Sequence, residues 1–333
     1  MEGLKPKIII TYQDKNVTSD FAPILKSVSF RDYLEGRAAE VDLHFSNEKG
    51  FFLGDWFPEV DDRITLKIGY ENMELINCGT FWVDEVKLTG SNGGDEVNVR
   101  ALSMKSSLVY APVKKQVHVR KTFKELAMQI MGETGLKAVG DLDGTWSGVQ
   151  NESDMALLFR IAKETGRIFK VEGDELIFYE TKNITQMVQV KPDYLLEIPR
   201  GNVLSYDISD KAAGRISKCT VKWWDQKTKK NISGTFDAGI KGGGSATIWE
   251  EVKDESEAQK KAQDYITERN KKGEEFTMQL MGDVRLRAGV CVKPRGFGRF
   301  DKTYYIAEAT HTVSSSGYAT SITLHTNDRN GNS

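Results

Sequence analysis

The side chains that could carry chemistry are few and widely separated in this 333-residue chain. The residues that most often bind metals or act as nucleophiles are His44, His118, His311 and His325, and Cys78, Cys219 and Cys291. None of them stands in a zinc-binding spacing such as H-E-x-x-H or C-x-x-C. An odd set of scattered cysteines is also a poor disulfide framework. We therefore predict no metal, no cofactor, three reduced thiols, and histidines that are ordinary strand residues.

Motifs for a catalytic nucleophile or a phosphate site are missing as well. No G-x-S-x-G elbow occurs, and the glycine-rich segment 241–247 lacks the lysine of a phosphate-binding loop, so we expect a hairpin tip there. A glycosidase needs only two carboxylates, and the 48 Asp and Glu residues leave such a pair open. Adjacent strand residues such as Asp84 and Glu85 should point to opposite faces and not converge. We predict that the chain is not an enzyme and has no catalytic residues.

The charge is high but balanced, with 46 Lys and Arg against 48 Asp and Glu and a net charge of −2. This balance gives no strong field for nucleic acid or an anionic membrane. No run reaches the roughly 18–20 apolar residues of a membrane span, and the N-terminus lacks the apolar core of a signal peptide. We expect a soluble protein that is made in a reducing cytoplasm.

One segment is rich in aromatic residues, and it is the candidate partner interface. Residues 51–58 read FFLGDWFP, with no Lys or Arg that would favour stacking on nucleobases. The segment is either a loop folded over the end of a barrel or an apolar patch for a protein partner. The residues proposed for such an interface are Phe51, Phe52, Trp56, Phe57 and Pro58.

Most of the chain has the pattern of β-strands. Apolar residues alternate with polar ones over 39–45, 64–68 and 97–101, which is typical of strands with one buried face. Between them, Asn92-Gly93 favours a tight hairpin turn. Strands return after residue 220 and continue to Leu324. Several short strands at this spacing indicate barrels or sandwiches.

Helices are expected in the middle of the chain and once more near 254–272. Thr122 and Glu125 form a capping box, and a second helix starts near 151–154. A β-hairpin over 167–179 completes a small α/β module. In the last third, Asp254 with Glu257 three residues later indicates the start of a single further helix.

The two β regions look alike. Residues 81–85 lead to Gly93-Gly94 and an alternating strand at 97–101, and residues 304–308 lead to Ser316-Gly317 and a strand at 320–324. One constant offset aligns these segments. They are either similar aromatic-rich hairpins by chance or an internal duplication of one barrel with the α/β module inserted.

The order of segments resembles the late control gene D group of contractile-tail phages, the baseplate hub proteins. That group is similar to the hub part of the type VI secretion spike protein. The resemblance covers about residues 5–327. The matching segments are the first strand with Tyr12, the turn 54–58 (GDWFP), the strand 79–85 (GTFWVDE), the helix segment 151–162, and 257–262 with Gly282-Asp283 and Gly289.

The resemblance implies a mainly β fold with an α+β insertion. Two related tube-type β-barrel domains, 1–112 and 186–333, would flank an α/β domain at 113–185. Family hubs are homotrimers, so six similar barrels would form a ring with pseudo-sixfold symmetry. The implied function is a structural baseplate hub of a contractile phage or phage-like injection particle.

The implied partners are tail tube proteins, a central spike and other baseplate proteins. Only a polar tail follows Leu324, at 327–332, so we expect the trimeric spike to be a separate protein. DNA could pass through the channel without specific binding. The hub would be made in the bacterial cytoplasm and assembled into the virion or particle.

Two alternatives stay open: a tail-associated cell-wall hydrolase, and a surface- or carbohydrate-binding β protein that uses Trp56 or Trp223-Trp224. The sequence does not indicate whether the particle is a phage, a bacteriocin or another injection machine.

Overall fold

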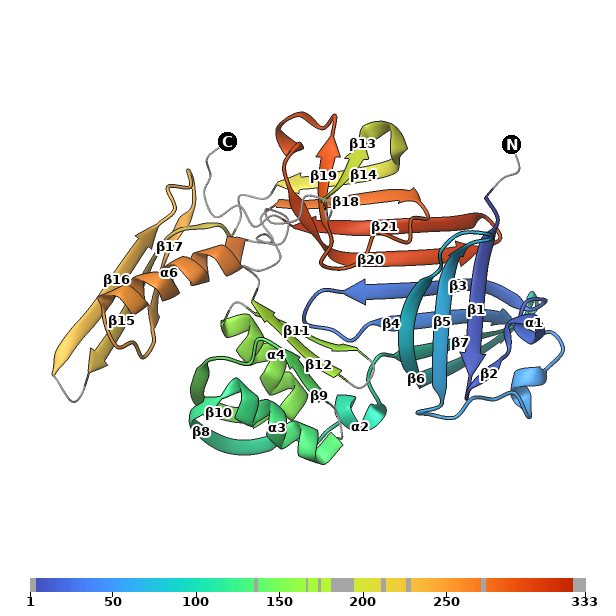
Figure 1. Ribbon diagram of the computed structural model, residues 1–333, viewed down its shortest axis with the longest axis horizontal. Helices are drawn as coiled ribbons and strands as arrows, with labels where there is room; N and C mark the ends of the chain where they lie inside the picture. The colour runs from blue at the N-terminus through green and yellow to red at the C-terminus, as the bar shows by residue number, and fades with distance from the viewer. Residues whose placement is uncertain are drawn as a thin grey trace.

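The computed structural model describes residues 4–134, 137–165, 167–172, 175–180, 195–210, 214–225, 229–270 and 274–325. Two predictions fall outside these ranges, namely the domain boundary between 185 and 186 and the polar tail at 327–332. As expected, the chain is mainly β with an α/β insertion (Figure 1). None of the described helices is both long and apolar enough to cross a membrane.

The first β unit is built from the N-terminal strands, in the sheet order β3-β4-β7-β6-β5-β1-β2. Gln13 and Asp14 both have positive φ, which fits a tight turn between β1 and β2. Two short helical turns, α1 (Thr18–Phe21) and η1 (Phe51–Leu53), lie in its loops. The strands are β1 (Pro6–Tyr12), β2 (Lys15–Asn16), β3 (Leu25–Tyr33), β4 (Glu40–Ser46), β5 (Arg63–Tyr70), β6 (Ile76–Ser91) and β7 (Gly94–Leu102).

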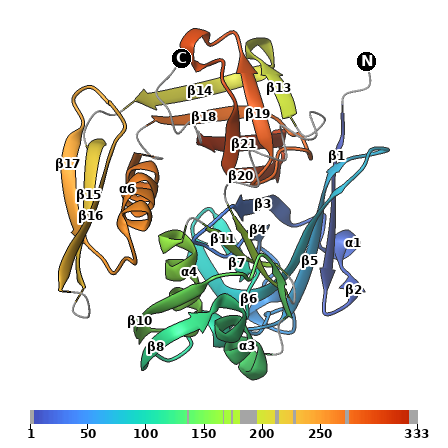
Figure 2. The ribbon, with the colours of Figure 1, turned by 60° about the vertical axis from the view of Figure 1, so that its left-hand side comes forward.

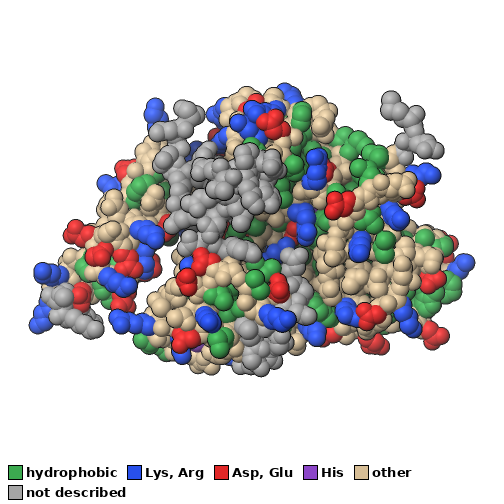
Figure 3. All heavy atoms as spheres, in the orientation of Figure 1, with side chains coloured by type: hydrophobic (Ala, Val, Ile, Leu, Met, Phe, Trp, Pro, Cys, Tyr) green, Lys and Arg blue, Asp and Glu red, His purple; other side chains and the backbone are tan. Residues whose placement is uncertain are grey.

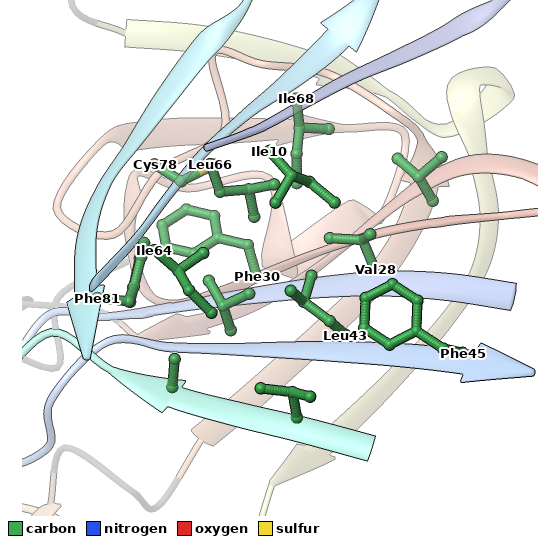
Figure 4. Packing of buried hydrophobic residues seen from close by; sticks show 14 of the residues in the cluster. Ile10, Val28, Phe30, Leu43, Phe45, Ile64, Leu66, Ile68, Cys78 and Phe81 are labelled. Carbon is green, nitrogen blue, oxygen red and sulfur yellow. The ribbon is translucent and has the colours of Figure 1, made fainter. Parts of the chain in front are cut away.

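The predicted alternation sets the core of this unit. On β4, Val41, Leu43 and Phe45 are buried, whereas Asp42 and His44 on the opposite face are partly exposed. Apolar residues of β1, β3, β5, β6 and β7 converge on the same interior (Figure 4). Removing this apolar surface from water is the main force that holds the unit together.

The middle module follows the first unit after α2 (Ser106–Val109) and has its own core. The predicted capping box is confirmed, because the Glu125 amide donates to the Thr122 hydroxyl (3.1 Å) and the Thr122 amide donates to the Glu125 carboxylate (2.7 Å). The elements are β8 (Lys114–Thr122), α3 (Phe123–Thr134), β9 (Lys137–Gly140), β10 (Thr145–Glu152), α4 (Asp154–Glu164), β11 (Arg167–Glu172) and β12 (Glu175–Glu180).

The second β unit contains the remaining strands of the large sheet. They run in the order β14-β18-β21-β20-β19-β13. A separate core of apolar residues, centred on Phe276, Tyr304 and Ile306, lies inside this unit. The strands are β13 (Leu195–Pro199), β14 (Val203–Asp210), β18 (Glu274–Met281), β19 (Cys291–Arg295), β20 (Tyr304–Ser314) and β21 (Gly317–His325), with the short turns η3 (Arg200–Asn202) and η4 (Gly298–Phe300).

A side unit between β14 and β18 departs from the sequence prediction, which counted its strands with the second barrel. β15 (Ile216–Asp225), β16 (Lys230–Asp237) and β17 (Gly244–Trp249) pair only with one another, with β15 in the middle. The predicted helix, α6 (Glu255–Asn270), covers one face of this sheet (Figure 2). The strands form a separate sheet because Cys219 and Val221 pack against Ala258 and Ala262 of α6.

The glycine-rich segment 241–247 is also not a hairpin tip. It leads from β16 into β17, and these strands flank β15 on opposite sides, with β17 parallel to β15. The connection therefore crosses over β15 instead of joining neighbouring strands. The proposed domain limits remain predictions.

One strand pair, which we call the joint, makes the two β units a continuous sheet. β3 of the first unit pairs antiparallel with β20 of the second, from Tyr33↔Glu308 to Ser27↔Ser314. The middle module lies below the joint in the view of Figure 1. Buried Asp32 ties the parts together, because its carboxylate accepts from Lys170 Nζ of β11 (2.6 Å) and from the Ala288 amide (3.2 Å).

Candidate assembly interface

The repeated hairpins have the same register, residue for residue. One constant offset converts every pair between β6 and β7, from Trp82↔Leu102 to Ser91↔Gly94, into a pair between β20 and β21, from Tyr305↔His325 to Ser314↔Gly317. Each hairpin has a β-bulge at the same place, after Val83 in one copy and after Ile306 in the other. Because bulges are specific features of a strand pair, this agreement identifies an internal duplication.

The turns of the two hairpins also agree. Gly94 and Gly317 occupy equivalent positions with φ of 112° and 115°, a conformation that favours glycine. The Gly93 amide donates to the Ser91 hydroxyl (3.1 Å), and the equivalent Ser316 amide donates to the Ser314 hydroxyl (3.3 Å). The sequence similarity of the two hairpins therefore reflects the same backbone conformation in both copies.

The duplication extends to the next two strands of each unit. β3 pairs with β4 as β14 pairs with β18, and both pairs have a bulge at the equivalent residue, after Leu25 and after Val203. β5 and β19 each pair with the start of the long hairpin strand. The outermost strands differ, since β1 is antiparallel to β5 whereas β13 is parallel to β19.

The five residues predicted as a partner interface divide into two groups. Phe52 and Pro58 are buried, and the Phe52 amide donates to the Asn47 side chain (3.0 Å). Phe51, Trp56 and Phe57 are exposed, and the Phe51 and Trp56 rings stack with centroids 4.7 Å apart. The segment thus covers the first unit with two buried residues and exposes an apolar surface with three others. That this surface contacts a protein partner remains a prediction.

An open pocket of about 210 Å³ lies beside this aromatic surface. Its walls are mostly apolar and include the Phe21, Phe45 and Trp56 rings, with Phe21 packed against both other rings at 4.9 and 5.6 Å. Asp20 and Asp55 also line it. An apolar side chain next to a basic group would suit this pocket.

The four histidines lie in separate strands and do not form a cluster. Nε2 of His44 lies 3.0 Å from Glu96, and buried His118 lies 2.8 Å from Gln150. His311 is buried at the joint, with Nδ1 2.7 Å from the Tyr318 hydroxyl and Nε2 2.8 Å from the Leu286 carbonyl. Because a carbonyl can only accept, we place the proton on Nε2. Burial lowers the pKa of His311 to about 4.

The three cysteines are buried and form no disulfide. Burial raises the pKa of Cys78 and Cys219, and it raises the pKa of Cys291 to about 11. A buried thiol that resists ionisation is a poor nucleophile. These thiols therefore act as small apolar side chains.

The side chains of Asp84 and Glu85 converge, although adjacent strand residues were expected to point to opposite faces. The bulge at this position breaks the alternation of the strand, so both carboxylates approach the guanidinium of Arg100. The Asp84 side chain also accepts a hydrogen bond from Tyr110 (3.1 Å). Both acids thus serve as partners of one cation. Within the described ranges, no group of His, Cys, Asp and Glu has the arrangement of a metal site.

Two further exposed apolar surfaces differ from the sequence analysis, which did not mention the first and named Trp223-Trp224 for the second. On the β8–β10 ribbon, Val117, Val119 and Val149 are exposed while His118 is buried, which inverts the usual pattern. In the sequence, the alternation of Val and His at 117–119 was the pattern that could have indicated this surface. In the side unit, Trp223 packs toward α6, whereas Trp224 and Trp249 are exposed on the sheet.

Charged side chains are mixed over the face of the molecule in Figure 3, where basic and acidic groups alternate instead of gathering by sign. This agrees with the net charge of −2. A face of this kind gives little non-specific attraction to a polyanion.

Comparisons with known sequences give matches over parts of the chain. Residues 244–325, from β17 to β21, match the model of the YQBQ-like family. The probable baseplate hub protein of Escherichia phage 186 is 25% identical over 234 residues, which cover 68% of this chain and 58% of that protein. The match therefore spans less than two thirds of that relative's length.

Solved structures share the fold over almost the whole chain. The 43 kDa tail protein of prophage MuSo2 from Shewanella oneidensis has a TM-score of 0.70 at 17% identity, covering 97% of this chain and 99% of that one. The E. coli c3393 protein, a type VI secretion component similar to the T4 tail proteins gp27 and gp5, has a TM-score of 0.55 at 13% identity, covering 98% and 78%. This chain has the fold of these tail and secretion proteins, and its sequence is similar to that of a baseplate hub protein.

Proposed function

We propose that this chain is a structural hub of a contractile phage tail or phage-like injection particle. A homotrimer would join the tail tube to a separate, central spike protein, with other baseplate proteins around it. DNA would pass through its channel without sequence-specific contacts. The protein would be made in the bacterial cytoplasm and assembled into the baseplate.

The observation that carries this proposal is the duplicated β unit with its matching bulges. Three copies of a chain with two such units present six similar surfaces around one axis. A ring of this kind can contact a sixfold tube on one side and a threefold spike on the other. The similarity to a probable baseplate hub protein supports the same role.

Light scattering on the full chain, alone and mixed with the spike protein of the same particle, tests the proposal. We expect a species of three times the 37.4 kDa chain mass, either alone or after mixing. Negative-stain images of that species should show a ring with six lobes. A monomer in both samples would reject the hub.

We further propose that the exposed aromatic surface, Phe51, Trp56 and Phe57, contacts a neighbouring baseplate protein. Its apolar rings and the acidic groups Asp20 and Asp55 at the adjacent pocket favour a partner segment with apolar and basic side chains. Phe52 and Pro58 would support this surface from below. The variant Trp56→Ala should reduce capture of that protein from assembled baseplates, with Met73→Ala, another exposed apolar residue, as the control.

The proposed role needs no catalysis. We expect the purified chain to leave peptidoglycan intact in a zymogram, with lysozyme as the positive control. Clearing by the chain itself would favour the cell-wall hydrolase instead.

A further inference from the structure

The large sheet has several strand edges that are open among the described residues, and two of them, on β14 and on β6, complement each other. β14 pairs with β18 on one side only. On β6, β5 covers the stretch from Ile76 to Trp82, but the outer edge from Glu85 to Ser91 has β7 alone as its neighbour. Open edges present unpaired amides and carbonyls, which favour the addition of another strand.

These two open edges are the internal equivalents of the two strands at the joint. The bulge after Val203 makes β14 the counterpart of β3, so Ile208 corresponds to Phe30. The hairpin register makes the second half of β6 the counterpart of the second half of β20, so Leu88 corresponds to His311. Because β3 and β20 pair with each other, the chain already contains one example of the contact that its open edges could make.

We propose that β14 of one chain pairs antiparallel with β6 of a second copy of this chain, in the register of the joint. The partner is a second copy because both complementary edges belong to this one sequence. Transferring the register of the joint gives the pairs Val86↔Asp210, Lys87↔Ser209, Leu88↔Ile208, Thr89↔Asp207, Gly90↔Tyr206 and Ser91↔Ser205.

Burial supports this pairing. At the joint, Phe30 and His311 lie directly opposite each other and both have 0% exposure. Their counterparts Ile208 and Leu88 are only half-buried, each packed against the core of its own unit. Placing these two residues opposite each other would join the two cores across the new strand pair, as happens at the joint.

The charges on the outer face agree with the same register. Lys87 would lie opposite Ser209 and diagonal to Asp207, within reach of its carboxylate. Neither Lys87 nor Asp207 has an ion pair within the described residues. The exposed Leu204, at the bulge of β14, would lie beside this contact.

The contact is head-to-tail, because it joins two different edges. Repeating it from chain to chain produces either a closed ring or an open filament. That three chains close the ring rests on the proposed hub function. The strand pairing itself rests on the internal duplication.

A designed disulfide tests the register. In the full chain, Lys87→Cys with Ser209→Cys places two thiols on one face of directly opposed residues, at about 4.5–5.5 Å between Cα atoms, which a disulfide can span. The native cysteines are buried, which keeps the background low. The matched control is Lys87→Cys with Ile208→Cys, whose side chains point to opposite faces of the sheet.

After oxidation, non-reducing gels should show cross-linked dimers and trimers for the first variant and monomers for the control. Light scattering of the reduced variant separates the two proposals. A trimer without cross-links would overturn the strand pairing and leave the hub role standing. A monomer at every concentration, alone and with the spike protein, would overturn both. Cross-linked chains of unlimited length would support the pairing and contradict a closed trimer.

A second variant tests the same contact without a disulfide. Leu88→Lys places a charge on the inner face of the open edge, a substitution that blocks strand addition. We expect loss of the oligomer with an unchanged circular dichroism spectrum. Thr89→Lys, on the outer face, should keep the oligomer. An intact oligomer in the Leu88→Lys variant would contradict the proposal.

Discussion

The joint and the open edges are the same strand positions in two different environments. At the joint, β3 and β20 bury an aspartate and a histidine, Asp32 and His311, among apolar side chains. At the equivalent open edges, the counterparts are Asp210 and Leu88, which are exposed and half-buried. Buried polar groups need fixed partners, and two other parts of the chain supply them at the joint: Lys170 of β11, and the backbone of the loop that contains Leu286 and Ala288. The comparison suggests that the joint is a permanent contact, whereas the open edges are suited to a contact that forms later.

The largest expected effect comes from removing the buried carboxylate of the joint. Asp32→Ala would leave Lys170 and the Ala288 amide without the carboxylate that pairs with them, so unfolding should become about 3–5 kcal/mol easier. Urea denaturation followed by fluorescence measures this change.

The matched control is the equivalent residue of the second unit. Asp210 is exposed and forms ion pairs with Arg215 and Arg299, so Asp210→Ala should cost less than about 1 kcal/mol. Equal losses for the two variants would show that the two environments do not differ as the structure indicates.

The next effect is a pH dependence that belongs to the joint. His311 is neutral in the fold because burial, the largest cause, lowers its pKa from 6.5 to about 4. The unfolded chain therefore binds more protons between these pH values, so stability is full above pH 6.5 and falls as the pH drops toward 4. The total loss should be about 3 kcal/mol.

Unfolding free energies at pH 7, 6, 5 and 4.5 check this prediction. In His311→Gln the side chain cannot titrate, so the part of the slope that belongs to the joint should disappear. His44→Gln, at a partly exposed residue, is the control and should keep the slope. An unchanged slope in His311→Gln would assign the pH dependence to other groups.

The smallest effect concerns the loops that follow β4 and β18 in the two units. The first unit has the aromatic segment there, whereas the second has Gly282 and Asp283, whose amide donates to Thr320 (3.0 Å). Since Phe57 is exposed, Phe57→Ser should change stability by no more than about 0.5 kcal/mol. A loss above about 1 kcal/mol in thermal or urea unfolding would mean that Phe57 supports the fold and not a partner surface.

Local patterns of the sequence predicted much of this fold. The capping residues Thr122 and Glu125, the turn at Asn92-Gly93 and the constant offset between the hairpins all depend on interactions between neighbours in the chain. Those interactions are visible without tertiary contacts, and the structure confirms them.

The errors arose where tertiary contacts decide the outcome. Alternation predicts a strand but not its partner, so the sequence did not indicate that β15, β16 and β17 form a sheet of their own packed against α6. A bulge at Asp84 cannot be read from strand alternation. Which aromatics of the segment 51–58 are exposed depends on loop geometry, and the burial of Asp32 depends on Lys170 from another module.

The joint also has a consequence for synthesis, because its two strands come from opposite ends of the chain. β3 cannot pair with β20 until the ribosome has synthesised the chain from Tyr33 to Glu308. At roughly 5–20 residues per second, this synthesis takes on the order of tens of seconds. During that interval the first unit can fold while β3 still lacks its neighbour. In a cell making many copies, β3 of one nascent chain could meet β20 of another and produce domain-swapped aggregates.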